Sequence, residues 1–270
     1  MDALRIAAIG DYFIGVDTFR RSLEAELTTP FSLTGTDFPW PDVPFHDRTG
    51  QAGPEIAEYC GTPEEVEPYL ADAEVLLTHL GPVTRGLIAK APKLRFIGLT
   101  RGSYTNLDMP AARERDIAVV NVPGRNASAV AEFTVGAILA ECRRITTGHA
   151  GLASGTWRGD LYRFDRTGDE LSDLTVGILG YSHIGQRVAR LLKPFGCRII
   201  VCDPFVNLNV YDAIEGVEQT DLDDMIARSD VVTLHARVTQ ETIGIISRER
   251  IAAMKPGAVL INTARGSLVD

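Results

Sequence analysis

The stretch that decides the fold is Gly177-Ile-Leu-Gly180-Tyr-Ser182-His-Ile-Gly185-Gln-Arg-Val-Ala189. It joins an apolar run, typical of a buried strand, to apolar residues spaced as in an amphipathic helix. Gly180 permits a tight turn at the end of the strand, and Gly185 lets the helix pack closely against it. Ser182 stands where a G-x-G-x-x-G pattern has its second glycine. The stretch therefore predicts a strand–turn–helix unit whose helix begins with free N–H groups.

A second strand, Arg198–Cys202, turns this unit into a predicted dinucleotide site. The strand ends at Asp203, 18 residues after Gly185, where an acidic side chain accepts hydrogen bonds from ribose hydroxyls and repels a 2′-phosphate. The free N–H groups and partial positive charge of the helix N-terminus suit a pyrophosphate. Asp203 favours NAD over NADP, although alone it could equally be a turn aspartate before Pro204. We interpret Ser182 as a tolerated variant whose hydroxyl can donate to phosphate.

Strands and helices alternate along the chain. After residue 174 the expected strands are Thr175–Leu179, Arg198–Cys202, Asp230–Leu234, Ala258–Asn262 and a short one near Val217. In the first 120 residues the expected strands are Arg5–Ile9, Glu74–Thr78 and Leu94–Leu99, and the expected helices are Phe19–Leu27 and Glu64–Leu70. This alternation predicts an α/β fold with two mainly parallel sheets, the second of them doubly wound with its ligand beyond the carboxyl ends of the strands.

The chain changes character at Val122–Asn126, where a proline and a glycine interrupt regular structure. A single long helix is expected from Ala127 to Thr147, because apolar residues recur there at helical spacing. We therefore expect two domains, residues 1–122 and 123–270. A proline-rich loop is expected at Asp37–Phe45.

Composition and charge argue against several classes of protein. The 270 residues are 45% hydrophobic and 23% charged, as in an ordinary globular protein. No apolar run reaches the roughly 18 residues that a membrane span needs, and the first residues lack a signal peptide's basic end, so a cytoplasmic protein is expected. A net charge of −9 argues against a nucleic-acid partner. The four cysteines are scattered, which predicts neither disulfides nor a metal site.

Three further stretches resemble one family of enzymes. They are Arg101–Asp108, Asn121–Glu132 and Met254–Asp270, and together with the glycine-rich turn they follow the family's order over nearly the whole chain. The family is that of the D-isomer-specific 2-hydroxyacid dehydrogenases, and the overall texture resembles the branch that includes D-3-phosphoglycerate dehydrogenases. The resemblance implies a flavodoxin-like substrate domain, residues 1–122, followed by a Rossmann-type NAD-binding domain, residues 123–270, that lacks its final strand.

The resemblance also implies roles for individual residues. Arg265 would be the catalytic arginine that holds the substrate's carboxylate and carbonyl oxygens, a task suited to a planar fork of charged donors. The family's substrate-binding loop corresponds to Arg101, Gly102, Ser103 and Tyr104. Its cofactor-binding residues correspond to Gly180, Ser182, His183, Ile184, Gly185, Asp203, Ala236, Thr263, Ala264 and Arg265. Of these, His183 and Ile184 would meet the pyrophosphate through their backbone, and Ala236 and Thr263–Arg265 would meet the nicotinamide half.

Departures from the family pattern bear on the substrate and on proton transfer. The substrate loop is two residues shorter than usual and has Ser103 in place of a glycine, so the identity of the substrate does not carry over. Arg237 replaces a frequent proline and receives no catalytic role. The family's proton-transfer histidine, and the acidic residue that orients it, lie downstream of the arginine, whereas the sequence ends five residues past Arg265. None of the five histidines takes that place, so we interpret the chain as truncated.

The activity implied is NAD-dependent transfer of hydride between nicotinamide C4 and C2 of a small 2-keto or 2-hydroxy acid, with Arg265 orienting the acid. The alternative from another class is a dinucleotide-sensing binding module resembling the corepressors that share this fold. A formate dehydrogenase is disfavoured by the different substrate loop. A homodimer is expected, with Trp157 near the interface, because relatives pair through the cofactor domain.

Overall fold

The computed structural model describes residues 3–40 and 55–270. The chain divides into two compact units, residues 1–125 and 126–270, each with its own sheet. The loop expected at Asp37–Phe45 begins later than predicted, because its first two residues belong to a strand. Residues 41–45 of that loop lie outside the described residues.

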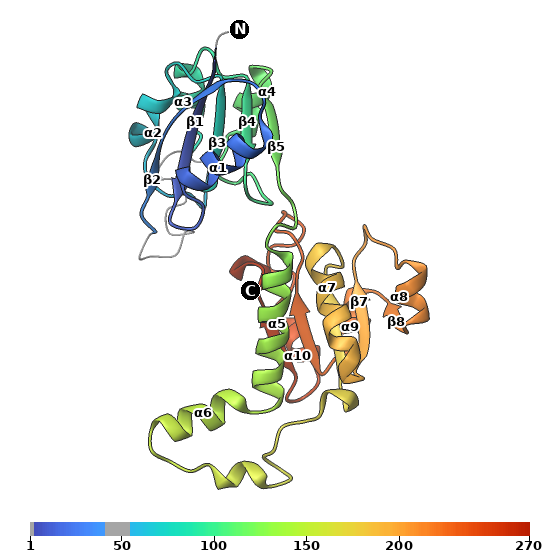
Figure 1. Ribbon diagram of the computed structural model, residues 1–270. Helices are drawn as coiled ribbons and strands as arrows, with labels where there is room; N and C mark the ends of the chain where they lie inside the picture. The colour runs from blue at the N-terminus through green and yellow to red at the C-terminus, as the bar shows by residue number, and fades with distance from the viewer. Residues whose placement is uncertain (1–2, 41–54) are drawn as a thin grey trace. The chain divides into compact units, whose positions relative to one another are not determined.

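Unit 1 is built on a five-stranded parallel sheet (Figure 1). The strands stand in the order β2-β1-β3-β4-β5, so the direction of winding reverses between β1 and β3. This is the order of flavodoxin-like folds, and it confirms the prediction. The strands are β1 (Leu4–Asp11), β2 (Phe31–Phe38), β3 (Val75–Thr78), β4 (Phe96–Leu99) and β5 (Ala118–Asn121). The helices are α1 (Val16–Glu26), α2 (Pro63–Leu70), α3 (Arg85–Lys90) and α4 (Met109–Glu114).

Short polar side chains fix where the helices of unit 1 begin. Thr62 and Glu65 form a reciprocal capping box at the start of α2: the Thr62 hydroxyl oxygen accepts the Glu65 N–H at 3.4 Å, and the Glu65 carboxylate accepts the Thr62 N–H at 2.8 Å. Thr84 and Asp108 cap α3 and α4 with a side-chain oxygen. These caps satisfy N–H groups that the helices themselves cannot pair.

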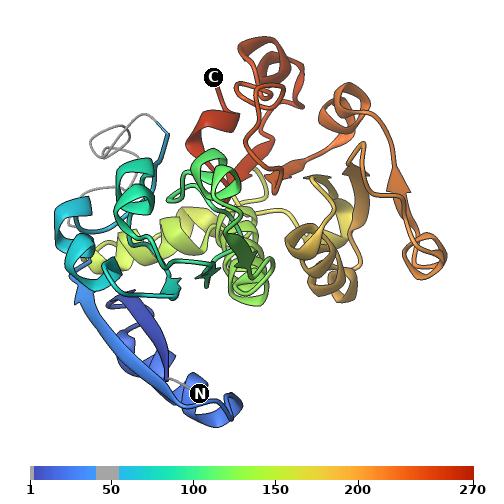
Figure 2. The same cartoon turned by 90° about the horizontal axis from the view of Figure 1, so that it is seen from above.

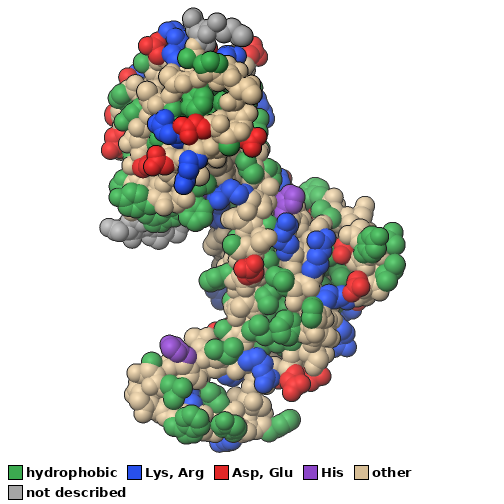
Figure 3. Space-filling model, in the orientation of Figure 1, with side chains coloured by type: hydrophobic (Ala, Val, Ile, Leu, Met, Phe, Trp, Pro, Cys, Tyr) green, Lys and Arg blue, Asp and Glu red, His purple; other side chains and the backbone are tan. Residues whose placement is uncertain are grey.

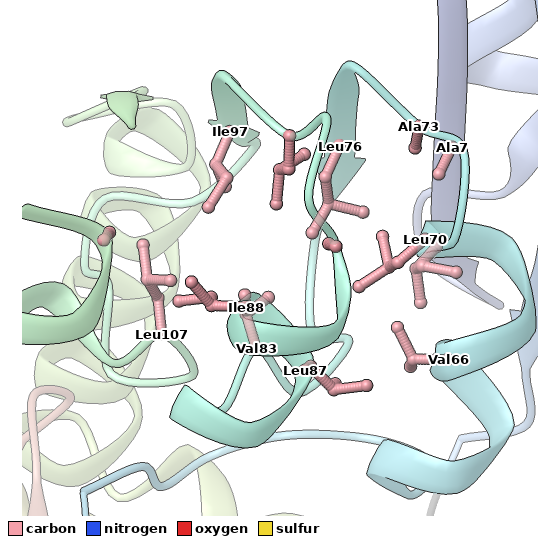
Figure 4. Close-up of a cluster of buried hydrophobic side chains, with 14 of the residues drawn as sticks. Ala7, Val66, Leu70, Ala73, Leu76, Val83, Leu87, Ile88, Ile97 and Leu107 are labelled. Atoms are coloured by element: carbon pink, nitrogen blue, oxygen red, sulfur yellow. The ribbon is translucent and has the colours of Figure 1, made fainter. Parts of the chain in front are cut away.

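The main core of unit 1 joins the sheet to α2, α3 and α4 (Figure 4). Leu76 and Ile97 from the central strands meet Val66 and Leu70 of α2 and Leu87 of α3, and each of the five is at most 2% exposed. Burying one such side chain contributes about 1.5–3 kcal/mol. This packing gives the loops at the carboxyl ends of the strands a rigid base.

Unit 2 also has a five-stranded parallel sheet, in the order β10-β9-β6-β7-β8. The winding reverses between β6 and β9, as in the doubly wound Rossmann arrangement that the sequence predicts. The strands are β6 (Thr175–Leu179), β7 (Arg198–Cys202), β8 (Val217–Gln219), β9 (Val231–Leu234) and β10 (Val259–Asn262). The helices are α5 (Ala127–Cys142), α6 (Ile145–Ala153), α7 (His183–Leu192), α8 (Val210–Ile214), α9 (Leu222–Arg228) and α10 (Arg248–Ala253).

Helices cover both faces of the unit 2 sheet (Figure 2). Successive residues of β6 point to opposite faces. Val176 and Ile178 belong to the core that includes α5 and α7, whereas Leu179 belongs to the core that includes α9. Because both faces are buried, the central strands are mostly apolar, and this makes them recognisable in the sequence.

The single helix expected at 127–147 is two helices. α5 ends at Cys142 and α6 begins at Ile145, because Arg144 adopts the left-handed backbone conformation with a φ of 55°. No glycine or proline marks this break in the sequence. After α6 the chain passes through a 3-10 helix, Gly159–Tyr162, in a segment that extends away from the sheet of unit 2 (Figure 1).

Candidate functional site

The candidate site of unit 2 lies along the carboxyl edge of its sheet. Because the strands are parallel, the segments that follow β6, β7, β9 and β10 meet at this one edge. The predicted residues stand there in turn: Gly180–Gly185 after β6, Asp203 after β7, Ala236 after β9 and Thr263–Arg265 after β10. Doubly wound sheets bind their ligands where the winding reverses, which here is between β6 and β9.

The turn after β6 requires its two glycines. Gly180 has a φ of +92°, and a Cβ at this position would lie 2.7 Å from the backbone nitrogen of Ala236. A Cβ on Gly185 would lie 2.1 Å from the carbonyl oxygen of Gly180. Both distances exclude a side chain. The loops after β6 and β9 therefore meet through bare backbone, and α7 starts directly against β6.

Ser182 is the N-cap residue of α7 and is exposed. Its φ of −97° is open to any residue with a Cβ, so a serine replaces the usual glycine without backbone strain. His183 and Ile184 follow as the first residues of the helix, whose first N–H groups have no partner within it. These donors and the glycine turn fit a pyrophosphate, because an anion gains both hydrogen bonds and the favourable helix dipole.

Asp203 is tied to the glycine-rich turn. Its Oδ2 accepts the Tyr181 N–H at 2.7 Å, and its Oδ1 accepts the Phe205 N–H at 2.9 Å. Each carboxylate oxygen has a second lone pair, so Asp203 retains capacity for two ribose hydroxyls. The contact with Tyr181, 22 residues away in sequence, was not predicted. It fixes the spacing between the candidate ribose-binding and phosphate-binding groups.

Hydrogen bonds also hold the segment after β10. The Thr263 hydroxyl lies 3.0 Å from that of Thr134 on α5. Asn262 donates to the Arg265 carbonyl at 2.8 Å and accepts the Ala264 N–H at 3.0 Å. These bonds fix the backbone of Thr263–Arg265, while the side chain of Arg265 is exposed and donates to the Ala264 carbonyl at 2.9 Å.

His235 follows β9 and is mostly buried. Its Nε2 lies 3.0 Å from the Thr233 hydroxyl, whereas its Nδ1 is buried with no hydrogen-bond partner in the described part of the chain. Burial lowers the pKa of His235 to about 4, so the ring is neutral at neutral pH. A neutral, buried imidazole fits a structural or cofactor-adjacent role better than that of a general acid. Its unsatisfied nitrogen is a position that a bound cofactor can satisfy.

The predicted substrate loop lies in unit 1, after β4. Arg101 is 8% exposed and donates to the Glu58 carbonyl at 3.0 Å and to the Glu58 carboxylate. The Gly102 carbonyl accepts from the side chain of Asn121 at 2.8 Å, and Tyr104 is 49% exposed. Arg101 therefore organises the loop through Glu58, a partner 43 residues earlier that sequence reasoning missed.

Comparison with known proteins places this geometry in a family. Residues 135–270 match the model of the "D-isomer specific 2-hydroxyacid dehydrogenase, NAD binding domain". The chain is 42% identical over 211 residues to the D-3-phosphoglycerate dehydrogenase of Methanocaldococcus jannaschii, covering 77% of this chain and 39% of that protein. It is 37% identical over 217 residues to the glyoxylate reductase of Thermofilum pendens, covering 80% and 64%. The chain thus spans less than two thirds of each of these relatives.

Solved structures share the fold. The TT0316 protein of Thermus thermophilus has a TM-score of 0.77 and 27% identity, covering 99% of this chain and 76% of that one. The D-lactate dehydrogenase of Aquifex aeolicus, complexed with NAD and lactic acid, has a TM-score of 0.74 and 26% identity, covering 98% and 70%.

The fold and the carboxyl-edge site define a two-unit α/β protein with a Rossmann-type dinucleotide-binding domain. The chain belongs to the D-isomer-specific 2-hydroxyacid dehydrogenase family, and residues 135–270 are its NAD-binding domain. In residues 3–40 and 55–270, no helix is long and apolar enough to cross a membrane. Nor does that part of the chain contain a group of three or more His, Cys, Asp or Glu side chains able to hold a metal ion.

Proposed function

We propose that the protein is an NAD-dependent oxidoreductase that transfers hydride between nicotinamide C4 and C2 of a small 2-keto or 2-hydroxy acid. One observation carries the proposal: the glycine-rich turn, Asp203 and Arg265 all follow strands of one parallel sheet and stand at its carboxyl edge. Relatives named as dehydrogenases and reductases of such acids support the reaction class. The alternative of a module that only senses the dinucleotide has no support among them.

Different residues of unit 2 would bind different parts of the cofactor. The first N–H groups of α7, at His183 and Ile184, would hold the pyrophosphate. Asp203 would accept the hydroxyls of the adenosine ribose, and the backbone at Ala236 and Thr263 would line the nicotinamide half. NAD, when bound, supplies the hydride chemistry, and the chain supplies position and charge.

Arg265 is the proposed catalytic residue. Its planar guanidinium presents parallel N–H donors that match a carboxylate, and a further donor can stabilise negative charge developing on the carbonyl oxygen. The bonds from Asn262 fix the backbone from which this side chain projects. The loop Arg101–Tyr104 stays a predicted substrate-binding segment of unit 1, in which Arg101 acts through Glu58 as a positioning residue.

Oxidation of NADH with a panel of 2-keto acids tests the proposal. The family's proton-transfer histidine lies downstream of Arg265, so we expect no turnover by residues 1–270 alone, because the reduced carbonyl oxygen needs a proton. A protein that also carries that histidine and its acidic partner should turn over at least one of glyoxylate, hydroxypyruvate and 3-phosphohydroxypyruvate. Arg265→Ala should lower kcat/KM by roughly 10²-fold or more, because it removes the charge that meets the developing oxyanion. NADH binding, followed by nicotinamide fluorescence, should weaken far less than kcat/KM falls, even though Thr263–Arg265 is expected to meet the nicotinamide half. Arg237→Gln, which removes another exposed positive charge of unit 2, is the control and should retain activity.

The absence of turnover with every 2-keto acid in the protein that carries the downstream histidine would contradict the proposal. So would full activity in Arg265→Ala.

We also propose that the protein forms a homodimer through unit 2. Large apolar side chains are exposed along α5, α6 and the segment that follows, and hydrophobic side chains are visible over this segment in Figure 3. They include Phe133 (70%), Leu152 (60%), Trp157 (72%), Tyr162 (83%) and Phe164 (98%). Exposed large apolar side chains concentrated in one part of the chain are typical of an interface.

A further inference from the structure

Unit 1 contains a side-chain cluster that the proposed hydride transfer does not use. Asp11 is the last residue of β1, and His79 directly follows β3. β1 and β3 are neighbours in the sheet, and the winding of unit 1 reverses between them. Parallel α/β sheets open a binding crevice beyond the carboxyl ends of their strands at this reversal. The cluster therefore stands where the topology favours a ligand.

Asp11 holds the other members of the cluster in place through its two carboxylate oxygens. It is 1% exposed, its Oδ2 lies 2.7 Å from the His79 Nδ1, and its Oδ1 accepts the N–H groups of Phe13 at 2.8 Å and Ile14 at 3.0 Å. Burial acts to raise the pKa of Asp11, but these hydrogen bonds outweigh it and leave the pKa lowered. An ionised carboxylate only accepts, so the Nδ1 of His79 carries the proton and the Nε2 is left for a partner.

Arg125 lies beside that second nitrogen. Its Nη2 is 3.4 Å from the His79 Nε2, and its guanidinium carbon is 5.2 Å from the centre of the Phe13 ring. Phe13 also stacks on the imidazole of His79, with ring centroids 5.6 Å apart and an interplanar angle of 28°. The ring of Trp40 lies 6.3 Å from that of Phe13. The aromatic face thus positions the exposed guanidinium next to the imidazole.

We propose that Arg125 and His79 form an oxyanion-binding site in unit 1, held in place by Asp11 and Phe13, for a carboxylate or phosphate group of a small organic acid. A guanidinium N–H and a protonated Nε2–H are strong, charge-assisted donors to oxygen anions. The charged groups within hydrogen-bonding distance of the His79 ring in the described structure are Asp11 from β1 and Arg125 from the segment after β5.

The site selects among substrates if the oxyanion belongs to the substrate, and that part of the inference rests on the proposed function. A 2-keto acid with a second acidic group would bind more tightly because that group occupies the oxyanion site. A monoanionic 2-keto acid has no such group and would not. A free inorganic anion offers the same oxygen atoms. Binding and kinetic measurements separate the two sources.

Calorimetric titration with inorganic phosphate and with malonate tests the site directly. We expect both probes to bind the wild-type protein. Arg125→Gln and His79→Asn should each weaken binding at least tenfold. In His79→Asn the amide N–H replaces Nδ1 as donor to Asp11, so the fold is retained while Nε2 is lost. Arg21→Gln removes an exposed charge from α1 and should bind as the wild type does.

Wild-type protein that binds neither probe, or Arg125→Gln that binds both unchanged, overturns the site. Whether the bound oxyanion belongs to the substrate or is a free anion follows from the ratio of kcat/KM for oxaloacetate to kcat/KM for pyruvate. A fall of at least tenfold in this ratio in Arg125→Gln, but not in Arg21→Gln, assigns the oxyanion to the substrate. Probe binding with an unchanged ratio supports a site for a free anion and overturns the substrate assignment. Wild-type protein that transfers hydride but binds neither probe contradicts the anion site alone. Wild-type protein with the downstream histidine that binds both probes but transfers no hydride contradicts the proposed function alone.

Discussion

Asp203 accepts a hydrogen bond from the glycine-rich turn and is proposed to bind the ribose. A test variant therefore has to keep the first interaction while changing the second. Asp203→Asn keeps an oxygen that can accept the Tyr181 N–H but loses the negative charge. We expect wild-type protein to bind NADH at least tenfold more tightly than NADPH, a difference of about 1.4 kcal/mol. The asparagine variant should narrow this gap, because the 2′-phosphate is no longer repelled. Nicotinamide fluorescence measures both affinities.

The control for Asp203 is Asp173→Asn. Asp173 is exposed and precedes β6, so it lies at the amino edge of the sheet, and its loss should leave the preference unchanged. Equal affinities of the wild-type protein for the two cofactors would refute the role of Asp203.

His235 makes stability depend on pH. Burial lowers its pKa to about 4 in the folded protein, whereas the histidine of an unfolded chain titrates near 6.5. Between these values the unfolded state binds a proton that the folded state does not, so the free energy of unfolding falls as pH drops from about 6.5 to about 4. The loss from this residue is at most about 3 kcal/mol.

Urea unfolding at pH 7.5, 5.5 and 4.5 measures this effect. His235→Gln should flatten the fall, because glutamine does not titrate. His149→Gln, at an exposed position, should leave the fall as it is. The same slope in wild type and His235→Gln would show that another group controls the acid range.

At the scale of elements, the close start of α7 against β6 depends on one missing Cβ. Gly185→Ala would place a methyl group 2.1 Å from the Gly180 carbonyl oxygen, so strand and helix must separate. We expect a loss of at least about 2 kcal/mol in stability, from overpacking, and at least tenfold weaker NAD binding. Chemical denaturation and fluorescence titration give the two values.

Gly136→Ala is the matched control for this turn. Gly136 is an exposed glycine inside α5, and a Cβ there would meet nothing within 4 Å. This substitution should raise stability by about 0.5–1 kcal/mol, because alanine favours the helix. If Gly185→Ala behaved like Gly136→Ala, the tight turn would not be what positions the cofactor.

How deeply an element is buried determined whether its sequence pattern predicted it. The central strands of both sheets are covered on both faces and appear as apolar runs, so their positions were predicted to within a residue or two. β2 and β5 were missed, since both are edge strands of unit 1 with half-buried or exposed residues at most positions. The break between α5 and α6 was missed because Arg144, which adopts the left-handed conformation there, is not a typical breaker.

The position of the candidate site residues at the carboxyl edge of the unit 2 sheet was predictable to the extent that these residues lie within one motif. The glycine turn and Asp203 follow from spacing along two successive strands. The pair of Asp11 and His79 was missed, because 68 residues separate its members and only the pairing of β1 with β3 brings them together. Both residues occur where apolar strands end, and that coincidence was the available signal.

At the scale of the whole molecule, the exposed apolar segment after α5 bears on the oligomeric state. Trp157 and Phe164 are 72% and 98% exposed, in a segment that extends away from the sheet of unit 2 (Figure 1). Leaving large aromatic surfaces in water forgoes the free energy that their burial would provide, about 25 cal/mol per Å². We propose that a second copy of the chain buries this apolar surface in a homodimer.

Light scattering at micromolar concentration should therefore give the mass of a dimer. The double variant Trp157→Ser, Phe164→Ser should shift the mass toward the monomer, because it removes two of the largest apolar contacts available to the interface. Phe205→Ser removes an equally exposed aromatic group from the other end of unit 2, after β7, and should remain dimeric. Circular dichroism confirms that each variant is folded. A wild-type monomer would refute the dimer, and a dimer that survives the double substitution would place its interface elsewhere.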